Sequence, residues 1–338
     1  MDFIYDLGLF TSKLFIVVIG LGLFFGVIAL MIQKGQKLKP HLEIENLNEH
    51  LHDLEWKLKE VVLSEKQLKE EHKKDKEKIK KDEERWEKKK RIFVLDFDGD
   101  IEAHAGERLR EEVTAILTLA NPKDEVVLRL ESPGGVVHGY GLSSSQLARI
   151  RKANIPLTIC VDKVAASGGY MMACVGNRIL SAPFAIIGSI GVVAQVPNFN
   201  KFLKKHDIDF KEYTAGEYKR TVTMLGEITP EGEKKFNSQL FETHVLFKKF
   251  VSSNRPQVEI DKIATGEYWY GQQALELKLV DELITSDDYL TQQRDSAHIF
   301  KVSLKTKKKL SEKISDAFGK ITSRVITDLV TRSSNYKI

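Results

Sequence analysis

Cysteine is scarce in this sequence, and the residue clusters that bind metals or nucleotides are missing. Only 2 of the 338 residues are cysteine. Cys160 and Cys174 fall in a predicted strand and a predicted helix, so we expect buried thiols and no disulfide framework. There is no Cys-x-x-Cys, no His-Glu-x-x-His and no ladder of carboxylates, which predicts no metal site. The Gly-Lys-Ser/Thr phosphate loop is also missing, so we expect no ATPase activity and no cofactor.

An excess of charge of one sign is missing as well. The chain has 52 basic and 48 acidic residues and a net charge of +4, so its overall charge indicates no nucleic-acid partner. The hydrophobic content of 42% and the length of 338 residues allow one large domain with appendages. Basic residues concentrate in segments 73–91 and 301–309, which we expect to lie outside that domain.

The N-terminal region contains a long apolar run. Leu14–Ile32 has no charged residue, and at about 1.5 Å per residue a helix of this length spans roughly 29 Å, enough for a bilayer core. The run is longer than the apolar stretch of about 7–15 residues in a cleaved signal peptide, and Gln33-Lys34-Gly35 is not a small-residue cleavage site. We therefore predict that residues 1–33 form an uncleaved single-pass anchor in the cytoplasmic (inner) membrane. Lysines on both sides of the run leave open which side of the membrane the large domain faces.

Residues 34–91 are mostly charged or leucine-like, with no glycine or proline after Pro40. In the first half, apolar residues recur at steps of three and four, which is the spacing of a coiled-coil seam. In the second half the corresponding positions are mostly polar. We predict a long charged helix, coiled-coil in part, that acts as a spacer or mediates self-association, with a solvated linker as the alternative.

Strand and helix patterns alternate from residue 92 onward. Apolar runs predict buried strands, and helical patterns lie between them. The strands are expected at 92–97, 126–130 and 157–161, and the helices at about 106–120 and 139–152. This alternation is typical of an α/β fold with a mostly parallel sheet.

Two further helices are predicted near the C-terminus. Thr229-Pro230-Glu231 has the residue types of a helix start, which predicts a helix to about residue 253. Residues 298–338 form a basic tail in which apolar residues recur every three or four positions. This pattern predicts an amphipathic helix that binds the membrane surface, packs in an oligomer or docks on the chain's own domain.

A serine lies where a predicted strand turns into a helix. The segment Asp162-Lys163-Val164-Ala165-Ala166-Ser167-Gly168-Gly169-Tyr170 follows the apolar run that ends at Val161. Small neighbours at such a turn let a substrate backbone approach the hydroxyl, and the helix N-terminus offers free N–H groups to a developing oxyanion. The pattern indicates a nucleophilic serine, and an ordinary turn of small residues is the alternative from these residues alone.

Two more glycine-rich segments follow apolar runs. They are Glu131-Ser132-Pro133-Gly134-Gly135 and Gly188-Ser189-Ile190-Gly191-Val192. Backbone N–H groups exposed at such strand ends can approach a ligand closely. Along the chain the order is 131–135, 162–170 and 188–192. The three segments in that order resemble the signal peptide peptidase A family of membrane serine proteases (peptidase S49). The N-terminal apolar run and charged region make the SohB-type branch of that family the closest.

The resemblance covers about residues 92–285 and implies both a fold and an activity. The implied fold is the one shared by the Clp protease and the crotonases, with a serine protease domain at residues 92–297. The implied substrates are peptides or unfolded segments, including signal peptide remnants, and the implied partners are the membrane and further copies of the chain. Residues 266–281 also resemble the family, in which this segment is structural.

A nucleophilic serine needs a base within hydrogen-bond reach. From the residues alone, His104 and His138 are candidates because each follows a predicted strand end, and their spacing does not select one. The resemblance implies a Ser–Lys dyad instead, with the lysine in Gly216-Glu217-Tyr218-Lys219. Lysine is a base only when it is neutral, so this role predicts that Lys219 is buried in an apolar cleft.

The resemblance thus makes Ser167 the expected nucleophile and Lys219 the expected general base of a membrane-anchored endopeptidase. The backbone N–H groups of Gly134, Gly135 and Gly168 are the expected oxyanion donors. Ser189 is expected to line the cleft or to orient the lysine. Two other functions stay open: a non-catalytic membrane scaffold of the same fold, and an acyl-CoA enzyme of the crotonase type.

Overall fold

The computed structural model describes residues 40–84 and 89–305, and a few residues between 15 and 26. The chain divides into two compact units, one of residues 43–303 and one of residues 1–42 with 304–338. Most of the expected membrane anchor, and the expected C-terminal tail beyond residue 305, lie outside the described residues. In the described part of the chain, no helix is both long and apolar enough to cross a bilayer.

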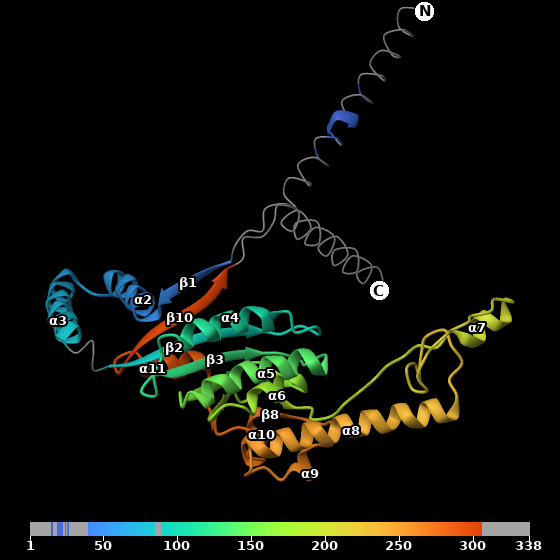
Figure 1. Ribbon diagram of the computed structural model, residues 1–338. Helices are drawn as coiled ribbons and strands as arrows, with labels where there is room; N and C mark the ends of the chain where they lie inside the picture. The colour runs from blue at the N-terminus through green and yellow to red at the C-terminus, as the bar shows by residue number, and fades with distance from the viewer. Residues whose placement is uncertain are drawn as a thin grey trace, which may run out of the picture. The chain divides into compact units, whose positions relative to one another are not determined.

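A seven-stranded sheet lies at the centre of the larger unit (Figure 1). Its strands, in spatial order, are β1 His41–Asn46, β10 Ala297–Lys305, β2 Lys90–Asp98, β3 Glu125–Glu131, β4 Leu157–Val161, β6 Arg178–Ser181 and β9 Glu282–Leu283. From β10 to β9 all neighbouring strands are parallel, so the carboxyl ends of β2, β3 and β4 share one edge. A second sheet holds, in order, β5 Val164–Ala166, β7 Ile186–Gly188 and β8 Tyr268–Tyr270.

Helices follow the strands in the predicted alternation, which confirms the α/β fold. From β2 onward they are α4 Ala105–Leu117, α5 Val137–Lys152, α6 Gly168–Ala173, α7 Asn200–Lys205, α8 Pro230–Asn254, α9 Ile260–Ile263, α10 Gly271–Glu276 and α11 Ser286–Gln293. Helix α8 begins as predicted, because Thr229 Oγ1 accepts the N–H of Gly232 at 3.1 Å and Pro230 occupies the first turn.

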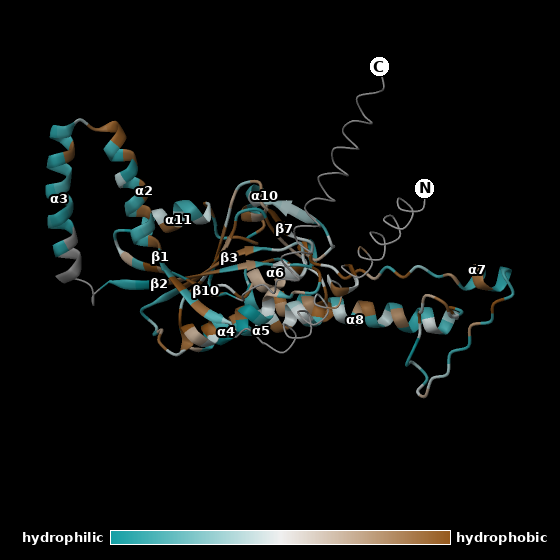
Figure 2. Ribbon diagram, turned by 90° about the horizontal axis from the view of Figure 1, so that it is seen from above, coloured by the Kyte–Doolittle hydropathy of each residue, from teal (hydrophilic) through white to brown (hydrophobic). Residues whose placement is uncertain are grey.

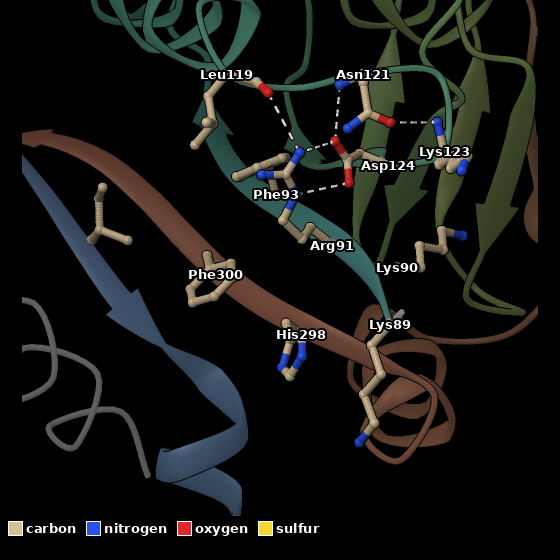
Figure 3. Close-up of a pocket in the computed structure, with 11 residues that line it drawn as sticks. Lys89, Lys90, Arg91, Phe93, Leu119, Asn121, Lys123, Asp124, His298 and Phe300 are labelled. Atoms are coloured by element: carbon tan, nitrogen blue, oxygen red, sulfur yellow. Dashed lines mark hydrogen bonds and ion pairs between the residues drawn. The ribbon is translucent and has the colours of Figure 1, made fainter. Parts of the chain in front are cut away.

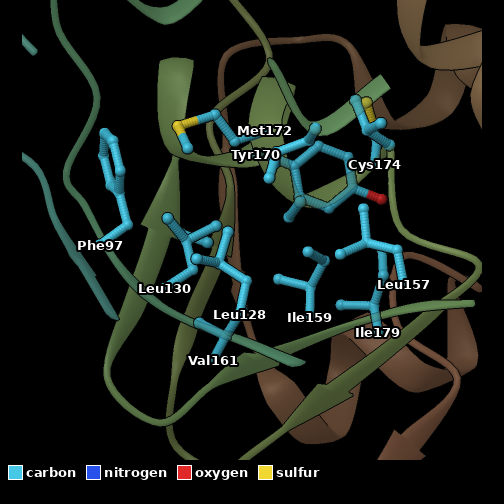
Figure 4. Packing of buried hydrophobic residues seen from close by; sticks show 14 of the residues in the cluster. Phe97, Leu128, Leu130, Leu157, Ile159, Val161, Tyr170, Met172, Cys174 and Ile179 are labelled. Atoms are coloured by element: carbon cyan, nitrogen blue, oxygen red, sulfur yellow. The ribbon is translucent and has the colours of Figure 1, made fainter. Parts of the chain in front are cut away.

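The packing of the sheet explains why its strands are almost continuously apolar. Every residue of β4 is buried, because both faces of the sheet are covered. Leu157, Ile159 and Val161 pack on one side with residues of β3 and α6 (Figure 4). Cys160 belongs to the cluster on the other side, whereas Cys174 lies in the first cluster. Both thiols are buried and form no disulfide, as predicted.

The predicted long charged helix is instead a pair of helices, α2 Leu47–Val62 and α3 Glu65–Glu84. The two helices lie side by side and are largely hydrophilic (Figure 2). Lys59 Nζ of α2 lies 3.0 Å from Glu71 Oε2 of α3, and the Trp56 ring stacks on His72 with centroids 4.3 Å apart. The segment therefore folds back on itself as a helical hairpin.

A helix-capping signal at Ser64 explains the break between α2 and α3. Gln67 Oε1 accepts the Ser64 N–H at 3.1 Å and the Ser64 hydroxyl at 2.8 Å, so Ser-x-x-Gln starts a new helix in the middle of the charged segment. The coiled-coil spacing of the leucines concealed this signal. Leucine periodicity measures only which side of a helix is apolar, and it does not show where the helix ends.

The large sheet includes residues on both sides of the predicted protease domain, residues 92–297. Residues 41–46 join the large sheet as β1, and Asn48 fixes the start of α2 to β10. Asn48 Nδ2 donates to Ala297 O at 3.0 Å, and Asn48 Oδ1 accepts the Ile299 N–H at 2.7 Å. Strand β10 continues the sheet to Lys305, so the segment predicted to begin the tail at residue 298 is part of the sheet.

The hairpin should loosen in acid because of Glu55. Hydrogen bonds from Lys59 and Arg294 lower the pKa of the Glu55 carboxyl from 4.5 to about 2. A carboxyl with a depressed folded-state pKa stabilises the fold above its unfolded-state pKa, and this contribution is lost as pH falls through the folded-state value. We expect the protection factors of the α2 amides, which are corrected for the pH dependence of intrinsic exchange, to fall between pH 4.5 and about 2, by no more than about fivefold for a partly exposed pair. Glu55→Gln should lack this step, and an unchanged acid profile in Glu55→Gln would contradict the assignment.

Candidate active site

Ser167 lies at the sharp turn between β5 and α6, as the sequence predicted. Its backbone has φ 51° and ψ −116°, a conformation that few non-glycine residues adopt. The Ser167 N–H donates to Gly188 O at 2.8 Å, and the Ser167 carbonyl accepts the Met171 N–H at 3.0 Å. Backbone strain of this kind costs about 1–3 kcal/mol and is concentrated at functional sites, where the surrounding structure enforces it.

The three glycine-rich segments meet at this turn. Gly134 has φ 91°, and a Cβ added to it would lie 2.7 Å from Ser167 Cβ. Ser132 joins the first two segments, because its N–H donates to Val164 O at 2.8 Å and its carbonyl accepts the Ala166 N–H at 3.0 Å. The third segment supplies the carbonyl that binds the Ser167 N–H. Motifs far apart in the sequence therefore form one site.

A small cavity of about 80 Å³ opens beside Ser167. Its lining is mostly apolar and consists of Gly135, Val137, Ser167, Gly168, Met171, Gly191, Val192, Val193, Thr243 and Phe247. This volume corresponds to roughly three water molecules, so the cavity accepts a small side chain. None of these lining residues carries an amine, an imidazole or a carboxylate side chain. A base for Ser167 must therefore approach from outside this wall.

The three expected oxyanion donors differ in their environment. The Gly134 N–H already donates to Ser132 Oγ at 3.1 Å. Gly135 and Gly168 line the cavity, and within the described chain no protein acceptor binds the N–H of either residue. Gly168 begins α6, where N–H groups have no partner inside the helix. Gly135 and Gly168 therefore have the available donors.

Ser189 supports the site through its backbone. It has a left-handed φ of 51°, and its N–H donates to Glu267 O at 2.7 Å. It directly follows Gly188, whose carbonyl holds the Ser167 N–H, but it is not among the residues that line the cavity. Its position indicates that Ser189 shapes the third segment.

Lys219 lies on a long connection, residues 191–229, that carries α7 and leads to α8; we call it the arm. Figure 1 shows the arm extending away from the two sheets. The Lys219 side chain is exposed, which differs from the burial predicted for a neutral base. In the described chain Lys219 does not line the Ser167 cavity and makes no hydrogen bond to Ser167. The structure of the single chain therefore does not bring the expected dyad together.

The two histidines suggested by the sequence also lie outside the cavity. The His104 side chain is 77% exposed, and its Nδ1 lies 2.7 Å from Asp100 Oδ2. This hydrogen bond raises the pKa of His104, so a larger fraction of the ring is already protonated near neutral pH and cannot accept a proton. His138 is exposed in the first turn of α5.

Helix α8 contributes residues that sequence analysis missed. Thr243 and Phe247 line the cavity. His244, one turn from Phe247 on α8, has its Nε2 atom buried without a hydrogen-bond partner among the described residues. Buried polar atoms are normally satisfied. His244 does not line the cavity, so its place beside Thr243, together with its unpartnered nitrogen, is what makes it a further candidate base to test. The sequence shows that Phe247 belongs to the apolar side of a helix, but it does not show that this helix covers Ser167.

A larger cavity, about 890 Å³, lies at the amino ends of β2 and β10 (Figure 3). Arg91 in this cavity donates to both carboxylate oxygens of Asp124, at 2.9 and 2.6 Å, and Lys90 is bound to Glu125. None of its lining residues is a serine, threonine or cysteine. The larger cavity therefore lacks a hydroxyl or thiol nucleophile, and the smaller one beside Ser167 is the candidate active site.

Gly134→Ala should reduce the rate of a reaction at Ser167 about 100-fold or more, because the added Cβ would displace the Ser167 turn and a misplacement near 1 Å costs roughly that much. The Cβ would also lie 2.7 Å from Ala166 O, at a φ of 91°, so the melting temperature should fall. Gly141→Ala is the matched control, since a Cβ there has no neighbour within 4 Å. The kcat of each variant, corrected for its folded fraction, tests this. Equal kcat values for Gly134→Ala and Gly141→Ala would contradict the close contact between Gly134 and Ser167.

Comparison with known proteins gives consistent matches. The sequence matches the family models "Peptidase family S49 N-terminal" over residues 2–147 and "Peptidase family S49" over residues 149–299. It is 48% identical over 348 residues to a Haemophilus influenzae protein named "Probable protease SohB", covering 98% of this chain and 97% of that protein. A protein of the same name from Buchnera aphidicola is 48% identical over 302 residues, covering 86% and 99%. A solved structure of a mutant "1510-N membrane-bound stomatin-specific protease" with a substrate peptide is 13% identical, covering 68% of this chain and 98% of that one, with a TM-score of 0.41.

Proposed function

Because the chain belongs to peptidase family S49 and is a serine peptidase, we propose that Ser167 is its nucleophile and Lys219 its general base. The observation that carries the assignment of Ser167 is its strained turn beside a cavity with two available backbone N–H groups. The assignment of Lys219 rests on the Gly216–Lys219 segment, which resembles the lysine segment of the family.

The proposed reaction begins when neutral Lys219 Nζ takes the hydroxyl proton of Ser167 as Oγ attacks a peptide carbonyl carbon. The N–H groups of Gly135 and Gly168 stabilise the oxyanion of the tetrahedral intermediate. Lys219 then gives the proton to the leaving amine, which breaks the C–N bond and leaves an acyl-enzyme. Water then attacks the ester as it loses a proton to the same lysine, and the lysine returns that proton to Ser167 Oγ as the acyl C–O bond breaks, which releases the carboxylic acid and restores Ser167.

We propose that the substrates are peptides or unfolded segments, including signal peptide remnants. The cavity of about 80 Å³ with Val137, Met171 and Phe247 in its wall supports a small apolar side chain next to the cleaved bond. Because the site is formed by backbone segments in a narrow space, a substrate must present an extended chain. Intact folded proteins rarely present one.

We propose that the chain forms a homo-oligomer, and the surface of the arm supports this. Many of its apolar side chains are exposed, including Val193, Phe199, Phe202, Ile208, Phe210, Tyr213, Tyr218 and Met224. Contiguous exposed apolar surface is uncommon on monomers and marks contact sites. Covering the arm, by a second copy or by closure onto its own domain, would also remove water from around Lys219, as its proposed role requires.

We further propose the membrane anchor and the type of protease fold predicted from the sequence. Residues 1–33 anchor the chain in the inner membrane, which the uncharged run Leu14–Ile32 supports, and the side that the protease domain faces is left open. The fold of that domain is proposed to be Clp/crotonase-like. Its support is the parallel sheet with a small second sheet that carries Ser167 at the end of β5.

The proposal is tested by labelling the detergent-solubilised full chain with a fluorophosphonate and mapping the adduct by mass spectrometry. We expect a single adduct, on Ser167. Ser145 is the internal control, because it is exposed on α5 and does not line the Ser167 cavity. An adduct on another serine would overturn the assignment of Ser167. No adduct in a folded, assembled sample would favour a scaffold with an idle site.

A further inference from the structure

The side chain of Tyr140, on α5, lies against the backbone segments around Ser132 and Gly168. Tyr140 is 0% exposed. Its ring lies directly against Gly168, where an added Cβ would be 2.4 Å from Tyr140 Cγ. Its hydroxyl lies 2.6 Å from Ser132 Oγ, and that oxygen accepts the Gly134 N–H at 3.1 Å. Tyr140 therefore connects the two segments that carry the candidate oxyanion donors.

The hydrogen bonds of this connection can run in only one direction. Tyr140 OH donates to Asp100 O at 2.8 Å, since a carbonyl oxygen only accepts. The phenol has a single proton, so Ser132 Oγ must donate to Tyr140 and keeps its lone pairs for the Gly134 N–H. Burial raises the pKa of Tyr140, so the phenol stays a donor. Each group therefore donates to the next: the Gly134 N–H to Ser132 Oγ, the Ser132 hydroxyl to Tyr140 Oη, and the Tyr140 hydroxyl to Asp100 O.

The space around the two hydroxyls is closed. A Cβ on Gly99 would lie 2.6 Å from Tyr140 Oη and 2.7 Å from Ser132 Oγ. The Phe97 ring meets the Tyr140 ring edge-on, with centroids 6.3 Å apart. Ser132 and Tyr140 are both 0% exposed, so both side chains are closely packed along this connection.

We propose that Tyr140 and Ser132 are positioning residues that set the separation of the Gly135 and Gly168 N–H groups. This inference rests on the proposed role of Ser167 as nucleophile. Oxyanion donors act only when they lie about 2.7–3.1 Å from the oxygen that becomes charged. Gly135 is covalently attached to Gly134, which the Ser132 hydroxyl holds, and Gly168 rests on the Tyr140 ring. Loss of the Tyr140 hydroxyl would therefore loosen one donor while the other keeps its support.

Tyr140→Phe tests the proposal, because it keeps the ring against Gly168 and removes only the hydroxyl. We expect kcat for a fluorogenic peptide to fall about 10–100-fold with KM within about twofold, the pattern of a lost transition-state interaction. The rate of fluorophosphonate labelling should fall in parallel. Ser132→Ala acts on the same connection and should give the same kcat loss, because the Gly134 N–H loses its acceptor.

Tyr289→Phe is the matched control for the loss of a buried phenol hydroxyl. Tyr289 is 5% exposed and packs in the core cluster that contains Cys160. Its hydroxyl donates a hydrogen bond to Glu125 Oε1 at 2.7 Å. It should lose comparable stability and keep the wild-type kcat. A kcat in Tyr140→Phe equal to that of Tyr289→Phe, or a change in KM alone, would overturn the proposal. If Tyr140→Phe does not fold, the same comparison with Ser132→Ala decides.

The test separates this inference from the proposed function beneath it. A wild-type chain without Ser167-dependent turnover would overturn both. A wild-type chain with Ser167-dependent turnover, together with unaffected Tyr140→Phe and Ser132→Ala variants, would overturn only the positioning role.

Discussion

Replacing Ser167 by alanine should lower kcat for peptide hydrolysis by at least about 10⁴-fold, as expected when the nucleophile of a catalytic unit is removed. The backbone donors and the cavity remain in this variant, so substrate binding should change little. In the described chain Ser167 Oγ makes no hydrogen bond to another residue, so stability should stay within about 0.5 kcal/mol of wild type. A fluorogenic peptide with a small apolar residue at the cleaved bond measures the rate, and thermal unfolding measures the stability.

The control for this variant is Ser145→Ala. Ser145 is exposed on α5, and its hydroxyl donates to Gly141 O at 2.8 Å, so its loss should leave hydrolysis intact. Retention of more than about a tenth of the wild-type kcat in Ser167→Ala would contradict its role, since residual catalysis without a nucleophile is orders of magnitude lower.

Lys219→Ala should lower kcat about 10³-fold, within the range of about 10²–10⁴ that general-base catalysis contributes. Lys219→Arg should not restore the rate, because a guanidinium keeps its proton. Lys219 is exposed in the single chain, so neither change should affect folding. Lys211→Ala is the matched control, since Lys211 is also an exposed lysine of the arm. The measurement is kcat for the same fluorogenic peptide.

Two histidines, His244 and His104, are the alternatives to Lys219 as the base. If Lys219→Ala and Lys211→Ala are equally active, Lys219 is not the base. A rate lost in His244→Gln or His104→Gln would then identify the base.

Mixing two inactive variants shows where the lysine comes from. Ser167→Ala and Lys219→Ala copies each lack one partner of the proposed dyad. Hydrolysis that returns when the copies are assembled together would show that the arm of one copy serves the serine of another. No recovery, with both variants assembled, would place the dyad within one chain.

The local elements were predictable because local forces determine them. The continuous apolar runs became β2, β3 and β4, since strands buried on both faces require apolar residues on both. Thr229 and Pro230 marked the start of α8 correctly, because helix capping depends on neighbouring residues alone. The same kind of signal at Ser64 and Gln67 divides the charged segment, because a local cap ends a helix whatever the spacing of its leucines.

What the sequence by itself determined is the α/β alternation, the two buried thiols and the turn on which Ser167 stands. Only the tertiary structure decided that Gly134 touches Ser167, that Tyr140 connects the two sides of the cavity, and that Phe247 of α8 closes it. It also left Lys219 exposed on the arm, where the sequence predicted a buried base. The physical reason is range: hydrogen bonds within a turn act between neighbours in the chain, whereas a catalytic cavity is made of contacts between distant segments.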